Sequence, residues 1–337
     1  MKIAIQYSPY SFYEEWMQYC EDHQIPYKVV NCYASDAIAQ LEDCNILLWH
    51  HNHANPKDVL FAKQLLASLE IAGKKVFPDY HSTWHFDDKL GQKYLFEATH
   101  IPHVPTHTFF DKKEALQWAK KTTYPKVFKL RRGAGSRNVW LVKSKEEAFK
   151  TIRKAFGKGF RQYDAFGGIK EQLRKYRLGK TNLKEIAKAV AHILYPIQLE
   201  KSQGRECGYV YFQDFIPQNT FDIRVIVIGN KAFAIKRHVR KNDFRASGSG
   251  FIEYKKELFD IDLIQQSFEN ASKIKAYCAA FDYVFLDGKP LVVEVSYGFN
   301  KAGYYDCPGY WTEDLNWHEG KFNPYGWMIE DSIATIK

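Results

Sequence analysis

The sequence predicts an α/β protein in which a parallel sheet is followed by antiparallel hairpins. In the first hundred residues, short apolar runs typical of strands alternate with helical segments, which implies parallel strands joined by helices. Further along, strand-like runs are joined by the two-residue turns Gly229-Asn230 and Asp287-Gly288, which are typical of β-hairpins. The chain has 337 residues, of which 45% are hydrophobic, enough for more than one packed core.

The first 85 residues are expected to form one α/β domain. Its expected strands are Lys2–Tyr7, Tyr27–Cys32, Asn45–His50 and Lys74–Asp79, and its expected helices are Phe12–His23 and Pro56–Ile71. Loops that follow the strand ends face ligands in such sheets, here Ser8–Ser11 and His50–Asn55. The second loop holds His50, His51 and His53, whose spacing fits no common zinc pattern. We therefore interpret these histidines either as groups that hydrogen-bond substrate or as ordinary polar loop residues.

Residues 86–205 combine helices with a glycine-rich hairpin. Helices are expected over Asp88–Thr99 and Glu114–Lys121, and the strand Tyr124–Leu130 leads through the tip RRGAGSRN into a second strand. Lys143–Arg205 is expected to be mostly helical and has 16 Lys and Arg against 6 Asp and Glu, a local net charge of +10. Such a segment can attract nucleic acid, an anionic lipid face or an acidic substrate, or can be a solvated helical surface.

Residues 206–337 are expected to be rich in hairpins. The expected elements are the strands Gly208–Ile216, Arg224–Ile228 and Ala232–Arg237, the helix Asp262–Phe281 and the hairpin Phe281–Ser296. The tail is dense in aromatic residues, which either pack in a core or contact substrate. These residues are Tyr304, Tyr305, Tyr310, Trp311, Trp317 and Trp327.

Composition argues against a secreted or membrane protein. The start MKIAIQYSPYSFYEEW has too short an apolar run for a signal peptide, and acidic residues follow at once. No window reaches about 18 consecutive apolar residues, so no membrane span is expected. The six cysteines form no CxxC pair. A reduced, cytoplasmic protein with buried cysteines is therefore predicted.

The hairpin tip after Lys129 has the composition of a phosphate-binding turn. Gly133, Gly135 and Ser136 allow backbone N–H groups to approach a polyphosphate closely, and Lys129 adds a positive charge. The turn joins two strands, so it is not the strand–GxxxxGK[ST]–helix arrangement. A plain turn is the alternative.

Two carboxylates and two arginines are expected to meet at one end of a sheet. The turn at 287–288 brings Asp282 and Glu294 together, and the turn at 229–230 brings Arg224 and Arg237 together. Convergent carboxylates without thiol or imidazole ligands suit Mg²⁺. Guanidinium groups facing them suit a metal-bound polyphosphate and an anionic acceptor.

The stretch NDFRASGSGF, residues 242–251, is expected to be a lid. It has no apolar periodicity, it is rich in Gly and Ser, and it carries Arg245. Gly248 and Gly250 would let it close over phosphates and exclude water.

The order of these parts resembles the ATP-grasp superfamily of carboxylate–amine ligases, with a layout similar to glutathione synthetases and ribosomal-protein glutamate ligases. The resemblance covers most of the chain. The segments DDKLGQKYLFEATHIPHVPT, YPKVFKLRRGAGSRNVWLV, YVYFQDFIPQNTFDIRVIVIGNKAFAIKR and FDYVFLDGKPLVVEVS carry it. It implies an N-terminal, Rossmann-like preATP-grasp domain, ATP and Mg²⁺ as cofactors, and an acyl-phosphate route to an amide.

The resemblance also implies roles for individual residues. Lys89 and Lys129 would face ATP, and the hinge Gln213, Asp214, Phe215 and Ile216 would read adenine through backbone groups. Arg224 and Arg237 would stabilise the transferring phosphoryl group, and Arg245 would hold the lid onto substrate. Mg²⁺ would be bound by Asp282, Glu294 and Ser296.

Two features depart from the family pattern. The metal hairpin commonly ends Glu-x-Asn, and here it reads Glu294-Val295-Ser296, which puts two-metal binding in doubt. The basic segment is also longer than the family's usual connection. The substrates implied are a small-molecule or carrier-linked carboxylate and an amine, such as an amino acid, a peptide or a sugar acid. The alternatives are an ATP-grasp kinase or phosphotransferase, an inactive nucleotide-binding protein and, least favoured, a nucleic-acid-binding module.

Overall fold

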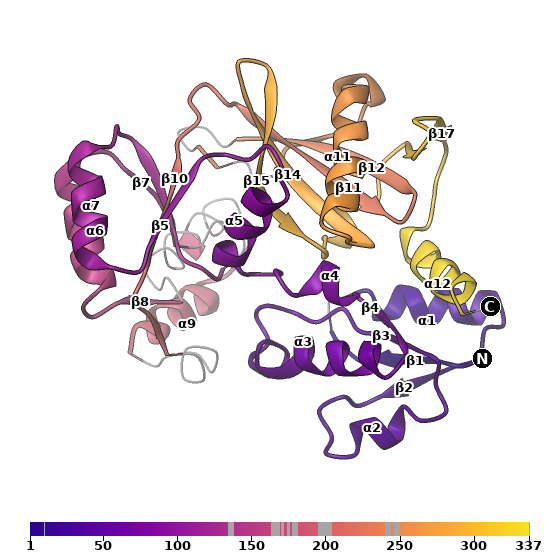
Figure 1. Cartoon of the computed structure of the whole chain (residues 1–337). Coiled ribbons are helices and arrows are strands. Elements are labelled where there is room, and N and C mark those ends of the chain that lie inside the picture. Colours follow the sequence, from indigo (N-terminus) through magenta and orange to yellow (C-terminus); the bar gives the residue numbers. More distant parts are fainter. Residues whose placement is uncertain are drawn as a thin grey trace. The chain divides into compact units, whose positions relative to one another are not determined.

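The computed structural model describes residues 1–9, 11–133, 138–162, 169, 172–173, 176, 181–194, 204–239, 244–245 and 250–336. The chain divides into two compact units (Figure 1). The larger unit comprises Met1–Phe86, Gly91–His103 and Gln218–Lys337, and the smaller unit comprises Asp87–Leu90 and Val104–Pro217. The sequence predicted domain boundaries after residues 85 and 205, and those boundaries stay a prediction.

The N-terminal part of the larger unit is a parallel sheet in the order β2-β1-β3-β4. Its elements are β1 (Ile3–Gln6), α1 (Tyr13–Asp22), β2 (Tyr27–Val30), α2 (Ala37–Gln40), β3 (Ile46–Leu48), α3 (Pro56–Ile71), β4 (Lys75–Phe77) and α4 (Tyr80–Thr83). The four expected strands and both expected helices are therefore present. The chain crosses from β2 over β1 to reach β3, so the strand order reverses between β1 and β3. Open α/β sheets bind ligands at the carboxyl ends of such a strand pair.

The rest of the larger unit is built on a seven-stranded antiparallel sheet in the order β15-β14-β11-β12-β16-β17, with β13 beside β12. The strands are β11 (Phe221–Ile228), β12 (Lys231–His238), β13 (Ile252–Glu253), β14 (Cys278–Leu286), β15 (Lys289–Ser296), β16 (Gly309–Thr312) and β17 (Trp317–Glu319). The helices are α5 (Lys89–Ala98), whose first two residues belong to the smaller unit, α11 (Ile261–Lys273) and α12 (Pro324–Ala334), with 3₁₀ turns at Lys256–Leu258 and Lys301–Gly303.

The two faces of this antiparallel sheet belong to different cores. Side chains alternate between the faces along each strand. Val225 and Val227 pack with residues of α11 such as Ile264. Ile226 and Ile228, on the other face, share a core with residues of the parallel sheet, α1 and α12. The second face therefore lies against the N-terminal parallel sheet and its helix α1.

Helix α11 is shorter than predicted, because it ends at Lys273 and not at Phe281. Lys275 has a φ of 57°, a left-handed conformation that ends helices. Residues 278–281 then pair with β11 as the start of β14. A short apolar run such as YCAAF fits a buried strand as well as a helix, so periodicity did not separate the two.

The aromatic tail mainly packs. Tyr304, Trp311 and Trp327 are buried, whereas Tyr305 is exposed. Five of the six cysteines are buried as expected, and Cys207 is exposed. Among the described residues, no helix is long and apolar enough to cross a membrane.

The smaller unit is an antiparallel sheet in the order β5-β10-β6-β7, with two helices packed against one face. Its strands are β5 (Thr106–Phe109), β6 (Lys126–Lys129), β7 (Val139–Val142) and β10 (Val210–Asp214), and its packed helices are α6 (Lys112–Lys121) and α7 (Lys145–Ala155). The basic segment also contains α9 (Leu183–Leu194) and an unpredicted two-stranded ladder between β8 (Phe160–Arg161) and β9 (Arg205–Glu206).

Candidate active site

Six polar residues share one face of the antiparallel sheet in the larger unit. In the strand register, Arg224 lies opposite Asp282, Asp222 opposite Arg237, and Asp282 opposite Glu294. Residues directly opposite each other, and residues two apart on one strand, point to the same face. The set is Asp222, Arg224, Arg237, Asp282, Glu294 and Ser296. The hairpin prediction that brought both carboxylates and both arginines to one end of the sheet is confirmed.

Four of these residues form a connected group of ion pairs, called here the arginine–aspartate cluster: Asp222, Arg224, Arg237 and Asp282. Arg224 donates to both oxygens of Asp282, with an Nη2–Oδ2 distance of 2.7 Å. Arg237 donates to both oxygens of Asp222 at 2.7 and 2.8 Å, and its Nη2 lies 2.9 Å from Oδ1 of Asp282. Both guanidinium groups are thus fixed by forked contacts, which suit planar recognition of an anion.

Burial and charge oppose each other in this cluster. Burial alone would raise the pKa of Asp282, but Arg224 and Arg237 outweigh it and hold that pKa below its ordinary value. The pKa of Asp222 is raised, mainly by burial. Two positive and two negative charges cancel, which is the condition under which a buried charge network is tolerated. The cluster therefore presents two ordered arginines without a buried excess charge.

The residues predicted to bind Mg²⁺ retain oxygen donors for it. From the described residues Asp282 accepts three hydrogen bonds, and these leave one of its four lone-pair positions, on Oδ2. The Ser296 hydroxyl accepts from the Gly298 backbone N–H at 3.0 Å and donates to the Gly298 carbonyl at 3.1 Å, which leaves it one lone pair. Glu294 lies on the same face, directly opposite Asp282 and two residues before Ser296.

The donor chemistry fits a metal that shares its shell with phosphate. Mg²⁺ typically takes one or two carboxylates and completes six-fold coordination with water and phosphate oxygens. Among the described residues, no group of three or more His, Cys, Asp or Glu side chains is placed to hold a metal alone. The residues present therefore fit phosphate-bound Mg²⁺ better than a closed protein cage.

In the smaller unit, the predicted ATP-facing residue Lys129 lies in a buried polar group. Its Nζ donates to Oε1 of Gln213 at 2.7 Å, and Nε2 of Gln213 is 3.3 Å from Oγ1 of Thr106. All three residues are buried. The neighbouring Phe128 and Phe212 pack with α6 and α7 on the other face of this sheet. The sheet thus has an apolar face covered by helices and an opposite face that carries a lysine ammonium group.

Lys89 is tied to the base of the glycine-rich turn. Its Nζ donates to the Gly133 carbonyl at 2.8 Å, and its backbone N–H donates to the Arg131 carbonyl at 3.0 Å. The Gly133 N–H donates to Asp87 at 2.7 Å, and Arg131 pairs with Asp88 at 2.9 Å. Gly133 has a φ of 123°, where a side chain would be strained. The structure therefore brings Lys89 and Gly133 together, and their role in binding ATP stays a prediction.

The predicted adenine hinge ends β10 and follows it: Gln213, Asp214, Phe215 and Ile216. Asp214 is held by Lys126, at 2.6 Å, and by His107, at 3.1 Å. These two partners were not predicted. The sequence signal for Lys126 was its place in an apolar strand, where a buried ammonium group needs an anionic or polar partner.

Part of the predicted site lies outside the described residues, namely Gly135 and Ser136 of the turn and Gly248 of the lid. Arg245 is described, and its guanidinium carbon lies 5.8 Å from the centre of the Phe244 ring. Gly250 has a φ of 78°, as glycine readily adopts. The lid function of this segment stays a prediction.

Sequence analysis did not foresee how the loop after β3 is held. Oδ2 of Asp58 accepts from the Asn52 N–H at 2.7 Å, and its Oδ1 accepts from the Tyr33 hydroxyl. The Asn55 amide donates to the same hydroxyl at 2.9 Å. Nε2 of His51 is 2.6 Å from the Thr83 hydroxyl. Nothing in the local pattern signals these contacts, because the partners come from distant parts of the sequence.

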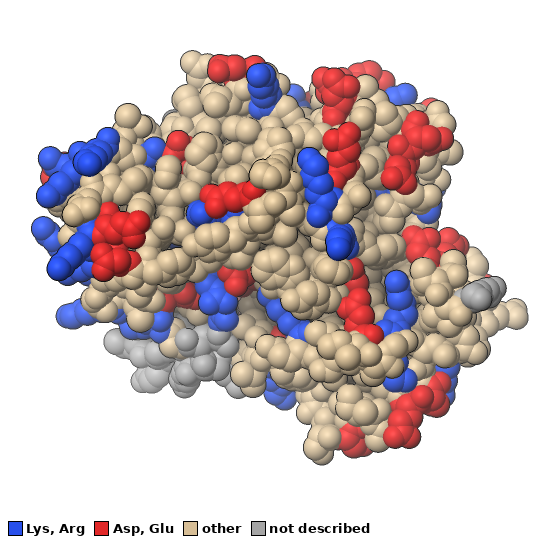
Figure 2. Space-filling model, viewed as in Figure 1, with Lys and Arg blue, Asp and Glu red and all other residues tan. Residues whose placement is uncertain are grey.

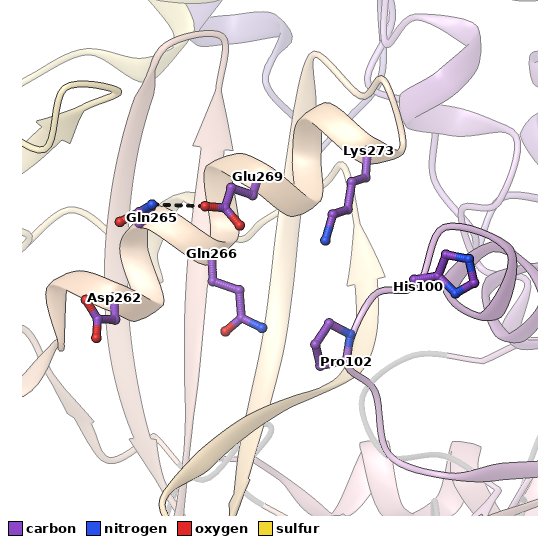
Figure 3. A pocket seen from close by; sticks show the side chains of 7 residues that line it. All are labelled: His100, Pro102, Asp262, Gln265, Gln266, Glu269 and Lys273. Carbon is purple, nitrogen blue, oxygen red and sulfur yellow. Dashed lines mark hydrogen bonds between the residues drawn. The ribbon is translucent and has the colours of Figure 1, made fainter.

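Two surface features lie apart from these residues. Lys and Arg gather over α6 and α7 in Figure 2, where the exposed cations include Lys113 and Lys120. A polar groove of about 430 Å³ runs along α11 (Figure 3), between residues such as Lys273 and Glu269 and the chain at His100 and Pro102. Since α11 covers the sheet face opposite Arg224, this groove is not part of the arginine–aspartate cluster.

The chain has the ATP-grasp fold, because solved structures that align with nearly its whole length share that fold. The α/β class and the ATP-grasp architecture predicted from the sequence are thereby confirmed. No family model and no curated protein matches the sequence.

Three solved structures illustrate the likeness. A RimK-domain ATP-grasp protein from Sphaerobacter thermophilus aligns over 98% of this chain and 99% of its own, with a TM-score of 0.56 and 15% identity. The ATP-grasp ligase PsnB in complex with a minimal precursor aligns over 99% and 98%, with a TM-score of 0.54 and 13% identity. D-alanine–D-alanine ligase from Bacillus anthracis aligns over 99% and 98%, with a TM-score of 0.52 and 15% identity.

Proposed function

We propose that the chain is an ATP-dependent carboxylate–amine ligase that uses Mg²⁺ and releases ADP and phosphate. The observation that carries the proposal is the shared sheet face that holds two ordered arginines, Arg224 and Arg237, and also Glu294. Fixed cations next to a metal-binding carboxylate suit phosphoryl transfer to an anionic acceptor. The fold is consistent with this chemistry, since PsnB and the D-alanine–D-alanine enzyme are ligases.

The proposed reaction has two steps. A carboxylate oxygen attacks the γ-phosphorus of ATP, the bond from that phosphorus to the β–γ bridging oxygen breaks, and ADP leaves. The amine nitrogen then attacks the acyl carbon, the C–N bond forms, the carbon–oxygen bond to phosphate breaks, and the amine loses a proton to solvent. Neither step needs a nucleophilic side chain, so the protein acts by positioning charge.

Each group in the larger unit has a proposed task. Arg224 and Arg237 bind the transferring phosphoryl group and the acyl phosphate, and Asp222 and Asp282 hold the arginines in place. Mg²⁺, held by Asp282, Glu294 and Ser296, would neutralise phosphate oxygens. Arg245 holds the lid onto substrate.

The smaller unit has the proposed task of binding ATP. The ammonium groups of Lys89 and Lys129 pair with phosphate oxygens. The turn of Gly133, Gly135 and Ser136 covers the phosphates through backbone N–H groups. The backbone groups of the Gln213–Ile216 hinge bind adenine.

A hydroxylamine trap tests the proposal. The protein is mixed with Mg²⁺, ATP, hydroxylamine as a generic amine, and pools of amino acids, peptides and sugar acids, and ADP, AMP and hydroxamate are measured together by mass spectrometry. ADP together with a hydroxamate would support the ligase and identify the carboxylate. Glu294→Gln is the matched control, which should make neither product.

Other products would change the assignment. ADP with a phosphorylated product and no hydroxamate would indicate a phosphotransferase. ATP binding without turnover in any pool would favour an inactive nucleotide-binding protein, and comparison with Lys129→Ala would show whether that binding uses the predicted site.

A further inference from the structure

Tyr304 packs on the sheet face that holds the arginine–aspartate cluster. Its ring meets Phe233 of β12 edge to face, with 5.5 Å between ring centres, and meets Phe299 in the same way at 5.3 Å. Phe233 lies opposite Ile226 in the strand register, and Ile226 is two residues from Arg224, so the three side chains share one face. The tyrosine therefore belongs to the core on the same side of the sheet as Arg224.

The Tyr304 hydroxyl lies next to the Arg224 guanidinium group and interacts with it, with Arg224 as the donor. Burial raises the pKa of this hydroxyl, and the charges of Arg224 and Arg237 oppose the rise without cancelling it. The hydroxyl is therefore protonated at physiological pH. It is an O–H donor held beside two positive charges.

The proton of this hydroxyl has no acceptor among the described residues. A guanidinium group has N–H donors only, so Arg224 can donate to the phenol oxygen but cannot accept its proton. The hydroxyl is not one of the enclosed polar atoms that lack a partner in the described part of the chain, so it is accessible from outside the core. By contrast, the Tyr297 hydroxyl in the same core donates to the His51 carbonyl at 2.6 Å.

A hydrogen-bonded turn sets the position of Tyr304. The Asn300 side chain begins a 3₁₀ turn by accepting from the Ala302 N–H at 3.1 Å. The Tyr304 N–H donates to the Lys301 carbonyl at 3.2 Å, and its own carbonyl accepts from the Cys307 N–H at 3.1 Å. With its backbone bonded on both sides and its ring packed, the hydroxyl can act without a further ordering cost.

The surroundings of the hydroxyl select an anion with several oxygens. Arg224 uses its Nε and Nη2 on Asp282, and within the described residues its Nη1 makes no hydrogen bond. A phosphoryl group can accept from a guanidinium and from a neighbouring hydroxyl at once, because each of its oxygens has several lone pairs. A buried tyrosine hydroxyl usually has a partner, and a phosphoryl oxygen supplies the acceptor that the protein does not.

We propose that the Tyr304 hydroxyl donates a hydrogen bond to an oxygen of the phosphoryl group that Arg224 binds. The inference rests on the ligase function proposed above and adds a neutral donor to its phosphoryl site. The hydroxyl keeps its proton, so neither step of the reaction gains or loses a proton through Tyr304. A fixed donor at this place stabilises the charge that spreads over the phosphoryl oxygens during transfer.

Two substitutions of tyrosine by phenylalanine form the test. Tyr304→Phe removes the hydroxyl and keeps the ring that packs on Phe233 and Phe299. Tyr283→Phe is the matched control, because its hydroxyl is fully buried in the core on the opposite sheet face, 3.0 Å from the Ser267 hydroxyl. Thermal unfolding of both variants establishes that they are folded.

Hydroxamate formation is measured with the carboxylate found in the trap, and ATP affinity is measured by calorimetry. Tyr304→Phe should lower kcat about tenfold or more, the effect of one lost hydrogen bond to a charged group, and leave the dissociation constant for ATP unchanged. Tyr283→Phe should lose stability and keep wild-type kinetics. An unchanged kcat in Tyr304→Phe, or an equal loss of kcat and ATP affinity, would overturn the inference.

A binding measurement separates failure of this contact from failure of the ligase function. MgADP is titrated with and without tetrafluoroaluminate, which imitates a phosphoryl group in transfer. Tetrafluoroaluminate should tighten MgADP binding to wild type, and this gain should be about tenfold smaller in Tyr304→Phe, while MgADP alone binds both proteins equally. An equal gain in both proteins, or no gain in wild type, contradicts the contact. The smaller gain without hydroxamate from wild type would support the contact and count against the ligase function.

Discussion

Asp282 accepts hydrogen bonds from both Arg224 and Arg237, so one carboxylate fixes the two guanidinium groups of the sheet face. The same residue lies directly opposite Glu294 in the strand register. Asp282 therefore connects the proposed phosphate-binding arginines to the proposed metal-binding hairpin. Mutations of these residues can change both stability and turnover, so the two effects must be measured separately.

Asp282→Asn should strongly destabilise the fold. The amide has nearly the same shape, but it removes one of two negative charges that balance two buried guanidinium groups. Breaking a buried ion pair by removing one partner typically costs about 3–5 kcal/mol. Urea denaturation of wild type and variant measures the change in unfolding free energy. A loss below about 1 kcal/mol would show that the cluster is solvated rather than buried.

Glu294→Gln should abolish turnover and leave the fold intact. The change removes one negative charge from the proposed Mg²⁺ shell, while the arginine–aspartate cluster keeps its partners. The measurements are ADP release and thermal unfolding on the same preparation. Normal turnover in this variant would mean that the metal assignment is wrong, whatever the stability shows.

Lys129→Met should weaken ATP binding by at least about tenfold, since it removes a charged hydrogen bond to phosphate from a buried site. The apolar chain of methionine keeps most of the packing volume. Lys121→Met, at the exposed end of α6, is the control for a lost surface charge and should bind ATP as wild type does. Titration calorimetry with ATP and Mg²⁺ compares the three proteins. Equal affinities would remove Lys129 from the proposed nucleotide site.

Local rules sufficed for the two hairpins but not for the whole site. The two-residue turn at 229–230 fixes the pairing of Asp222 with Arg237. The turn at 287–288 alone would pair Asp282 with Val293, and a register shift between Tyr283 and Asp282, which sequence analysis did not predict, places Glu294 opposite Asp282 and on its face. Helix α3 was predicted over Pro56–Ile71 from its apolar spacing and has those ends in the structure, where the Asn55 side chain caps it and Pro56 is its first residue.

Contacts between distant segments were beyond the reach of sequence patterns. Three such contacts form only when the chain folds. Arg237 pairs with Asp222 and Asp282, the Tyr33 hydroxyl donates to Asp58, and Lys126 pairs with Asp214. The prediction of where α11 ends was wrong for a related reason. Pairing with β11 turned an apolar run into a strand, and tertiary pairing overrides local preference in such runs.

Arg245→Ala should reduce turnover more than it reduces ATP binding. A lid residue acts when the closed state forms, so its loss should lower kcat by about tenfold or more while the dissociation constant for ATP changes little. Calorimetry gives the ATP affinity and coupled ADP release gives the rate. If both parameters fell by the same factor, Arg245 would be a ground-state ATP contact and the lid assignment would fail.

His50 and the buried His51 should make the protein less stable in mild acid. Burial lowers the pKa of His50 to about 3, and burial together with the charge of Lys63 lowers the pKa of His51 well below its ordinary value of 6.5. The folded state keeps both rings neutral, whereas the unfolded state takes up a proton on each below about pH 6.5. The unfolded state then binds more protons, so stability is lost as pH falls from about 6.5 toward 3.

The His50→Phe variant isolates one of these contributions. Each histidine held neutral costs up to about 1.4 kcal/mol per pH unit below 6.5. Between about pH 7.5 and pH 5, wild type should therefore lose roughly 1–2 kcal/mol more unfolding free energy than His50→Phe, which keeps the ring stacked on Phe12 but cannot titrate. Urea denaturation at the two pH values gives the difference. Identical pH dependence in both proteins would show that His50 is readily protonated in the folded state.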